Sequence, residues 1–239
     1  MKTTIVLPIP LESGEVTADF LPFIERWVST FGFCLAGCAV DVMGVCIGRD
    51  LPESIAPLFE DTPITFITYK GTGCDAGAFQ AAAAEIKTGF VIFSTSRVYF
   101  HRPGWGEALV SAREQFGPGL YGTSASREHR LHLCTRFFGM EAEDFLAATG
   151  DPITDRGQWA FGEAGGTKPN LLEWTRAAGK PAKLVAWSGV YDEPEWFSVP
   201  NRFRDGDQSD VLVWDRHTDI YRYSDPEQKE HLAKLGEEA

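Results

Sequence analysis

Residues 71–105 read GTGCDAGAFQAAAAEIKTGFVIFSTSRVYFHRPGW, and the order of elements within this stretch decides the expected fold. A glycine-containing loop leads into the alanine-rich segment Asp75–Lys87, which ends before a glycine and predicts a helix. The apolar run Phe90–Phe93 predicts a buried strand, and Ser94-Thr95-Ser96 forms a polar tip after it. A further helix is expected over Pro103–Phe116, with proline in its first turn. The stretch therefore predicts a helix–strand–helix unit of an α/β sheet.

Apolar runs on both sides of this stretch extend the same pattern. Buried strands are expected at Thr3–Ile9, Ala39–Ile47, Ile64–Tyr69, Leu120–Thr123, Leu131–Phe138 and, as the last strand, Lys183–Trp187. Helices are expected at Ala18–Phe31, Glu141–Ala148 and Asn170–Ala178, with a short one after Pro52. Because strands and helices alternate in the first half, we expect a parallel, doubly wound sheet with right-handed crossovers.

The C-terminal quarter has a different composition. Asp192–Tyr223 is polar, aromatic and marked by glycine and proline, which predicts an extended loop that packs over the sheet. Within it, Asp205-Gly206-Asp207 is interpreted as a turn, with a contribution to a metal site as the alternative. Gln228–Ala239 is charged and predicts a surface helix or a frayed tail.

Composition restricts the possible partners. The chain has 239 residues, 44% of them hydrophobic, with a formal net charge of −12. That charge argues against broad binding to nucleic-acid backbones, which requires lysine and arginine to displace counterions. The five cysteines include no CxxC pair, which favours free thiols in a reducing compartment. Neither a signal peptide nor a membrane span is evident, so we expect a soluble cytoplasmic protein.

In this order the elements resemble the GT-A glycosyltransferase fold, and most closely its family-2-like members, over residues 3–190. The resemblance implies a Rossmann-like, mostly parallel central sheet flanked by helices. It also implies a nucleotide-sugar-binding and catalytic domain at residues 1–190. Residues 191–239 are then expected to form a C-terminal extension that packs on the same domain.

The resemblance also implies a set of donor contacts. In that family a proline-containing loop after the first strand lies under the nucleotide base, which corresponds here to Pro8-Ile9-Pro10. The second strand ends in an acidic residue that touches base or ribose, which corresponds to Asp50. A glycine-rich loop and a helix N-terminus then face the donor. The implied donor-binding residues are Pro8, Ile9, Asp50, Gly73, Asp75, Ser94, Thr95, Ser96 and Arg97.

The sequence departs from the family at the tip of the fourth strand. Family members carry an Asp-x-Asp metal motif there, and this chain has Ser94-Thr95-Ser96 instead. Hydroxyls cannot offset the charge of a divalent ion on a diphosphate as carboxylates do. Three outcomes stay open: a metal-independent enzyme that relies on basic residues, a Mn or Mg ion held by the diphosphate and by ligands elsewhere, or binding without catalysis. The candidate metal ligands are Asp215 and His217.

Inverting glycosyl transfer needs a carboxylate near the acceptor hydroxyl and positive charge near the leaving diphosphate. The resemblance places the base just before a helix that ends in glycine, which makes Glu163 the candidate and Asp155 the second one. Positive charge is expected from Arg97, His101, Arg216 and His217. The basic run Arg127, His129, Arg130, His132 and Arg136 is expected either to line an acceptor or phosphate site or to lie on a solvated loop. Alternation places His132 and Cys134 on one face of a strand.

These features predict a glycosyltransferase that uses a nucleoside-diphosphate sugar and an acceptor that the sequence does not identify. A non-catalytic nucleotide-sugar or glycan-binding protein on the same fold is the alternative. A nucleotidyltransferase is a third hypothesis, but that class usually carries a basic residue in a glycine-rich loop after the first strand. Leu7–Glu15 contains neither arginine nor lysine.

Overall fold

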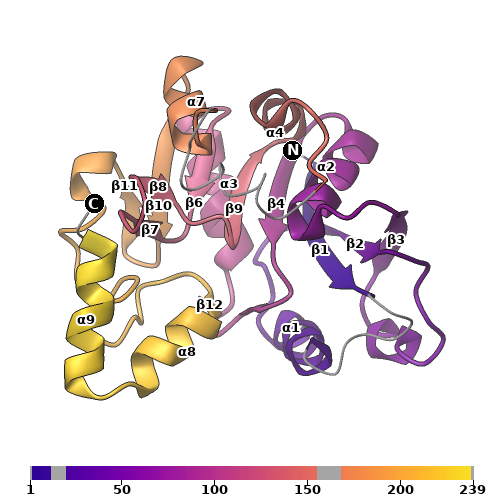
Figure 1. Ribbon diagram of the computed structural model, residues 1–239, viewed down its shortest axis with the longest axis horizontal. Helices are drawn as coiled ribbons and strands as arrows, with labels where there is room; N and C mark the ends of the chain where they lie inside the picture. Colours follow the sequence, from indigo (N-terminus) through magenta and orange to yellow (C-terminus); the bar gives the residue numbers. More distant parts are fainter. Residues whose placement is uncertain (1, 12–19, 155–167, 238–239) are drawn as a thin grey trace.

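The computed structural model describes residues 2–11, 20–154 and 168–237, and its centre is an eight-stranded sheet (Figure 1). The strands are β1 (Thr3–Pro10), β2 (Asp41–Ile47), β3 (Ile64–Tyr69), β4 (Phe90–Ser94), β6 (Leu120–Gly122), β9 (Phe137–Glu141), β10 (Ala182–Ala186) and β11 (Gly189–Tyr191). Their order across the sheet is β11-β10-β6-β9-β4-β1-β2-β3. Only β9 and β11 run against their neighbours in it. The predicted mostly parallel central sheet is confirmed.

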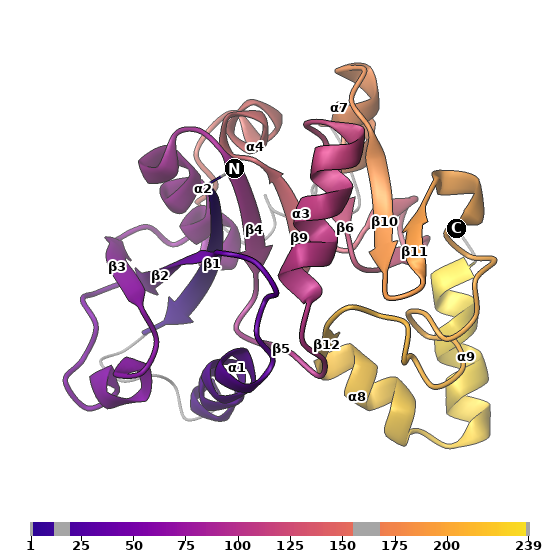
Figure 2. The ribbon, with the colours of Figure 1, turned by 180° about the vertical axis from the view of Figure 1, so that it is seen from behind.

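Helices cover both faces of this sheet, as the sequence predicts. The longer helices of the sheet region are α1 (Leu21–Phe33), α2 (Cys74–Ile86), α3 (Trp105–Phe116), α4 (Ala142–Thr149) and α7 (Leu171–Ala177). Helices α1 and α3 pack on one face, and α3 lies in front of the strands in Figure 2. Helices α2, α4 and α7 pack on the other face.

Strand β1 shows why a continuous apolar run folds in this way. Ile5 and Leu7 belong to the core on the α1 and α3 side, whereas Val6 belongs to the core on the α2 side. Successive side chains of a strand point to opposite faces, so a strand covered on both faces must be apolar at every position. The short helix expected after Pro52 is the 3₁₀ helix η2 (Ala56–Phe59).

The prediction of one strand over Leu131–Phe138 is wrong. The structure divides this segment into β8 (His132–Leu133) and β9. Strand β8 pairs with β7 (Ala125–Ser126) in a separate two-stranded sheet. The Cys134 amide donates to the Ser124 carbonyl, and the Arg136 carbonyl accepts from the Thr95 amide, both at 2.9 Å. Through these two hydrogen bonds, the segment between β8 and β9 connects the small sheet to the central sheet.

The predictions for the C-terminal quarter are also partly wrong. Lys183–Trp187 does not contain the last strand, because β11 follows β10, and β12 (Trp214–Asp215) pairs with β5 (Val98–Tyr99). Asp192–Tyr223 is not one extended loop, since it contains the 3₁₀ helix η3 (Glu193–Glu195), β12 and α8 (Arg216–Tyr223). The expected terminal helix is α9 (Pro226–Glu237).

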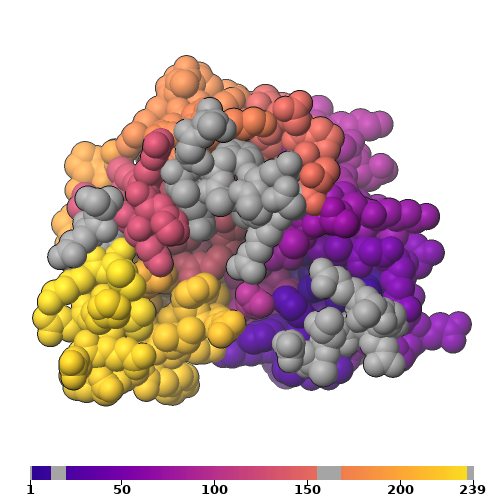
Figure 3. Space-filling model, in the orientation of Figure 1, coloured from indigo at the N-terminus to yellow at the C-terminus, as the bar shows by residue number. Residues whose placement is uncertain are grey.

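The C-terminal residues, in yellow, belong to one continuous surface with the rest of the chain in Figure 3. Pairing of β12 with β5 anchors them beside the end of β4. In the described part of the chain, no helix combines the length and the apolar composition that crossing a membrane requires.

Candidate functional site

A cavity of about 490 Å³ opens at the carboxyl ends of the parallel strands. Pro10 ends β1, Ile47 ends β2 and Thr95 follows β4, and all three line the cavity. Open α/β sheets bind ligands at this edge. The N-terminus of α2, the β7–β8 sheet and the N-terminus of α8 supply the other walls.

The cavity wall is basic, although the chain as a whole is acidic. Four arginines face three carboxylates in its lining: Arg97, Arg136, Arg204 and Arg216 against Asp75, Glu128 and Asp215. Three histidines, His129, His132 and His217, add further capacity for positive charge. The described lining thus has one more arginine than carboxylates in a chain of net charge −12, a balance that favours an anionic ligand.

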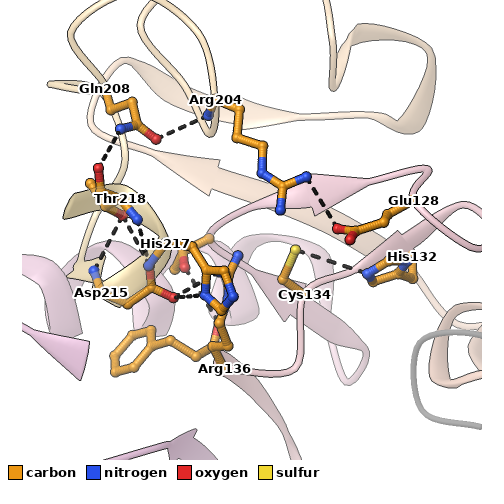
Figure 4. A network of polar contacts seen from close by, with 11 residues as sticks. Glu128, His132, Cys134, Arg136, Arg204, Gln208, Asp215, His217 and Thr218 are labelled. Atoms are coloured by element: carbon orange, nitrogen blue, oxygen red, sulfur yellow. Dashed lines mark hydrogen bonds and ion pairs between the residues drawn. The ribbon is translucent and has the colours of Figure 1, made fainter. Parts of the chain in front are cut away.

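Asp215 connects the cavity wall to helix α8, as Figure 4 shows. Its Oδ1 accepts from the amides of His217 and Thr218, each at 2.9 Å, and so caps the helix. Its Oδ2 lies 2.8 Å from Nη1 of Arg136. Burial raises the pKa of Asp215, but the Arg136 guanidinium, His217 and the cap bonds outweigh burial and hold the pKa well below its usual range.

Arg204 and Glu128 form a second ion pair in the cavity lining (Figure 4). Nη1 of Arg204 lies 3.1 Å from Oε2 of Glu128, and the Arg204 side chain is buried. The Arg204 amide donates to Oε1 of Gln208 at 2.9 Å, and Gln208 Nε2 donates to the Thr218 carbonyl at 3.1 Å. These bonds fix the 201–208 turn against α8, so the position of Arg204 is set by its backbone.

His132 and Cys134 lie on one face, as the alternation predicts, and both line the cavity. Nδ1 of His132 is 2.7 Å from the Arg130 carbonyl oxygen, so this nitrogen carries the proton. Its Nε2 lies 4.0 Å from Sγ of Cys134 (Figure 4). The basic run thus contributes His129, His132 and Arg136 to the cavity.

The glycine-rich loop before α2 is explained first by packing. The Tyr69 hydroxyl donates to the Ile153 carbonyl at 3.1 Å and accepts from the Gly73 amide at 3.2 Å. A Cβ at Gly71 or Gly77 would lie 2.2 Å from the Tyr69 hydroxyl oxygen. The glycines therefore make room for Tyr69, and this packing directs the N-terminus of α2 at the cavity.

The structure brings only some of the predicted site residues together. Those that line the cavity are Gly73, Asp75, Thr95, Arg97, Asp215, Arg216 and His217. Pro8 and Ile9 are buried inside β1, and Pro10 takes the place expected for them. Asp50 is exposed and accepts a hydrogen bond from the Thr68 hydroxyl, outside the cavity lining. The candidate bases Asp155 and Glu163 lie outside the described residues.

The two serines of the strand tip are not placed as expected. Ser94 is fully buried, and its hydroxyl accepts from Nε1 of Trp27 at 3.0 Å and donates to the Thr95 carbonyl at 3.2 Å. Ser96 is buried too and does not line the cavity. Contacts within the protein account for the Ser94 hydroxyl, so only Thr95 of this tip reaches the cavity.

His101 is also placed away from the cavity. Its Nε2 donates to the Val211 carbonyl at 2.8 Å, and its ring stacks on Trp214 with centroids 4.1 Å apart. Burial lowers the pKa of His101, so the neutral form is favoured. His101 therefore packs the C-terminal segment onto the sheet and supplies no charge to the cavity.

Sequence reasoning missed two charged residues of the described cavity lining. Arg204 and Glu128 lie far apart in sequence and in no recognisable motif, and only the fold brings them together. The sole signal was the turn predicted at Asp205-Gly206-Asp207. The structure supports that turn, since the Asn201 amide donates to Asp205 and the Ser209 amide donates to Asp207.

The described residues do not fit a divalent metal ion. Asp215 caps helix α8 with one carboxylate oxygen and pairs with Arg136 through the other. Asp215 and His217 lie close together, but two side chains are too few to hold a metal ion by themselves. Glu128 is paired with Arg204. Across residues 2–11, 20–154 and 168–237, no group of three or more acidic, histidine or cysteine side chains is arranged to hold a metal. The arginines instead fit an anion.

No protein-family description and no curated protein matches the sequence. Among solved structures, the chain is similar to a mannosyltransferase from Pyrobaculum calidifontis in complex with GDP-Man and Mn2+. The identity is 13% and the TM-score 0.47, over 62% of this chain and 46% of that chain. It is similar to TarS from S. aureus, with 10% identity and a TM-score of 0.43 over 63% of this chain and 30% of that one.

A third similar structure is a putative glucose-1-phosphate thymidylyltransferase from Bacillus anthracis in complex with a sucrose. Its identity is 10% and its TM-score 0.46, over 62% of this chain and 75% of that chain. The chain spans less than half of the length of the first two structures.

Proposed function

We propose that the chain is a glycosyltransferase that moves a sugar from a nucleoside-diphosphate sugar to an acceptor hydroxyl with inversion. The observation that carries this proposal is the arginine-rich cavity at the carboxyl ends of β1, β2 and β4. Such a cavity in an acidic chain selects a ligand with phosphate groups. The resemblance of the element order to the GT-A fold supports a nucleotide sugar as that ligand.

The size and the two ends of the cavity suit such a donor. Its volume of about 490 Å³ is within the range of small-molecule sites. Pro10, Phe20 and Ile47 give one end an apolar lining, against which a flat base packs. Arg97 lies at the same end, so a bound base would place its phosphates among the guanidinium groups.

The reaction is a single displacement at the anomeric carbon. The acceptor oxygen bonds to that carbon while the bond from the carbon to the diphosphate oxygen breaks. The nucleoside diphosphate leaves with the electron pair, and the acceptor proton passes to a carboxylate. In our proposal Glu163 is that base and Asp155 is the second candidate. Arginine side chains stabilise the charge that develops on the diphosphate.

The C-terminal segment takes part in the proposed site. The N-terminus of α8 brings Asp215, Arg216 and His217 to the cavity wall. We therefore propose that residues 191–239 complete the site of a catalytic domain formed by residues 1–190.

Calorimetry with UDP, GDP, dTDP and CMP tests the donor site, and mass spectrometry of donor hydrolysis or transfer tests the reaction. We expect one diphosphate to bind and its sugar conjugates to turn over. Glu163→Gln should retain binding and abolish turnover, with Asp155→Asn as the matched comparison. Turnover retained in Glu163→Gln and lost in Asp155→Asn would transfer the role of base to Asp155.

One observation favours the second candidate function, a non-catalytic nucleotide-sugar-binding protein. Two of the three described carboxylates in the cavity, Asp215 and Glu128, are already held in ion pairs with arginine. Binding without hydrolysis or transfer for every donor would support this alternative. Any turnover above that of the Glu163→Gln variant excludes it.

A further inference from the structure

Arg97 carries a positive charge that the described part of the protein does not balance. The residue follows β4 directly and lines the cavity. Its guanidinium carbon lies 4.9 Å from the ring centroid of Phe20 and 5.9 Å from that of Phe23. Among the described residues no carboxylate lies within ion-pair distance of it, and its buried Nε has no hydrogen-bond partner.

A half-buried guanidinium without a carboxylate is costly unless another anion balances it. Packing between the rings of Phe20 and Phe23 fixes the side chain, because arginine stacks on aromatic faces while its N–H groups stay available. The guanidinium group of Arg97 is thus fixed beside the end of β4, and no described carboxylate balances its charge. A ligand phosphate would supply that group.

Two other arginines of the cavity, unlike Arg97, each have a carboxylate partner among the described residues. Arg136 is paired with Asp215 and Arg204 with Glu128, one carboxylate to each. Both guanidinium groups also lie against the ring of Phe203, at 4.4 and 4.8 Å from its centroid. One ion pair uses only part of the five N–H donors of an arginine, so Arg204 keeps donors for a ligand.

These contacts oppose a metal ion at the same place. A divalent cation needs carboxylates, and to bind Asp215 it would have to displace Arg136 from an ion pair at 2.8 Å. Thr95, which follows β4, presents a hydroxyl group where a metal site would need a carboxylate. Its neighbours Ser94 and Ser96 are buried. Guanidinium groups match phosphate oxygens in planar pairs of hydrogen bonds without a metal.

We propose that the diphosphate of the ligand is bound by arginine side chains without a divalent cation, with Arg97 as its principal ligand. This inference rests on the proposed function and specifies how the leaving group is held. When the bond to the anomeric carbon breaks, Arg97 stabilises the negative charge on the departing oxygen. Arg204 keeps its carboxylate partner Glu128 and adds a donor.

The test is calorimetric titration of the full chain with UDP, GDP and inorganic pyrophosphate, each in manganese chloride and in EDTA. The variants are Arg97→Met, which keeps the length without the charge, and Arg97→Lys. Arg102→Met is the matched control, because Arg102 also stacks on an aromatic ring, that of Trp187, but lies outside the cavity lining. Thermal melting of each variant shows that it is folded.

We expect at least one diphosphate to bind equally well in EDTA and in manganese. Arg97→Met should weaken that binding by about 10- to 100-fold, as loss of a hydrogen bond to a charged group does. Arg97→Lys should recover part of the affinity, and Arg102→Met should match the wild type.

The contrary results are distinguishable. Binding that disappears in EDTA overturns the metal-free site and leaves the proposed function standing. Equal affinity of a folded Arg97→Met variant overturns the role of Arg97. Absence of binding to every diphosphate in both conditions overturns the proposed function, and this inference with it.

Discussion

Nη1 of Arg136 lies 2.8 Å from Oδ2 of Asp215, and this ion pair joins the approach to β9 to the N-terminus of α8. Its side chains are 19% and 8% exposed, so solvent screens the pair little. The same carboxylate caps α8 through its other oxygen. The Asp215 side chain therefore sets both the position of helix α8 and the charge balance of the cavity.

Asp215→Asn is expected to lower the stability of the protein at neutral pH. Asparagine remains a good N-cap, so the loss comes from breaking the buried ion pair with Arg136, a change that costs about 3–5 kcal/mol in buried pairs. Urea unfolding followed by tryptophan fluorescence measures it. Glu230→Gln is the control, because Glu230 pairs with Lys234 on the exposed face of α9 and its loss should leave the midpoint unchanged.

The pH dependence of stability follows from the depressed pKa of Asp215. A carboxyl group with a folded pKa below its unfolded value stabilises the native state above the unfolded pKa, about 4. That contribution is lost as the pH falls through the folded pKa. The stability difference between wild type and Asp215→Asn should thus be constant above about pH 5 and shrink below pH 4. A difference that grows on acidification would contradict this assignment.

The central sheet could be predicted because it is buried on both faces. Strands β1 and β4 are buried at every position and largely apolar, and the alanines of α2 are visible in the sequence. Strands β8 and β12 could not be found, since each has two residues and no periodicity. Pairing with β7 and β5 alone defines them.

The candidate site was only partly readable for a related reason. Thr95 and Arg97 could be located because they directly follow a predicted strand. Ser94 could not be assigned correctly, because only the fold places the Trp27 indole against its hydroxyl. Arg204 reaches the cavity from a turn whose position depends on contacts with α8, and no local pattern encodes those contacts.

Gly73→Ala should destabilise the protein, and Gly32→Ala should not. A Cβ at Gly73 would lie 2.0 Å from the Ile153 carbonyl oxygen, so backbone would have to move at the entrance to α2. A Cβ at Gly32 meets nothing within 4 Å, and alanine stabilises a helix by about 0.5–1 kcal/mol over glycine. Thermal melting checks both predictions: we expect a lower melting temperature for Gly73→Ala, and an unchanged or higher one for Gly32→Ala. Equal melting temperatures would show that the loop before α2 yields without cost.

Cysteine reactivity should report on the cavity. Burial, with a further contribution from Asp50, raises the pKa of Cys46 to about 11. Since the thiolate is the reactive form, Cys46 should be nearly inert to iodoacetamide at pH 8. Cys74 and Cys134 line the cavity, so a bound nucleoside diphosphate should slow their alkylation. Peptide mass spectrometry with and without ligand measures this. Unchanged alkylation of Cys74 and Cys134 in the presence of a bound ligand would place the ligand elsewhere.

Ser94→Ala should lower stability without weakening nucleotide binding. Removing the hydroxyl leaves Nε1 of Trp27 buried without its acceptor, which costs about 1–3 kcal/mol. Ser96→Ala is the matched control, because the Ser96 hydroxyl has no hydrogen-bond partner among the described residues and its removal should be nearly neutral. Unfolding curves give the first comparison and calorimetry with the bound diphosphate gives the second. A folded Ser94→Ala variant with unchanged stability but lost affinity would return Ser94 to the donor site, and would mean that the tip of β4 rearranges when the ligand binds.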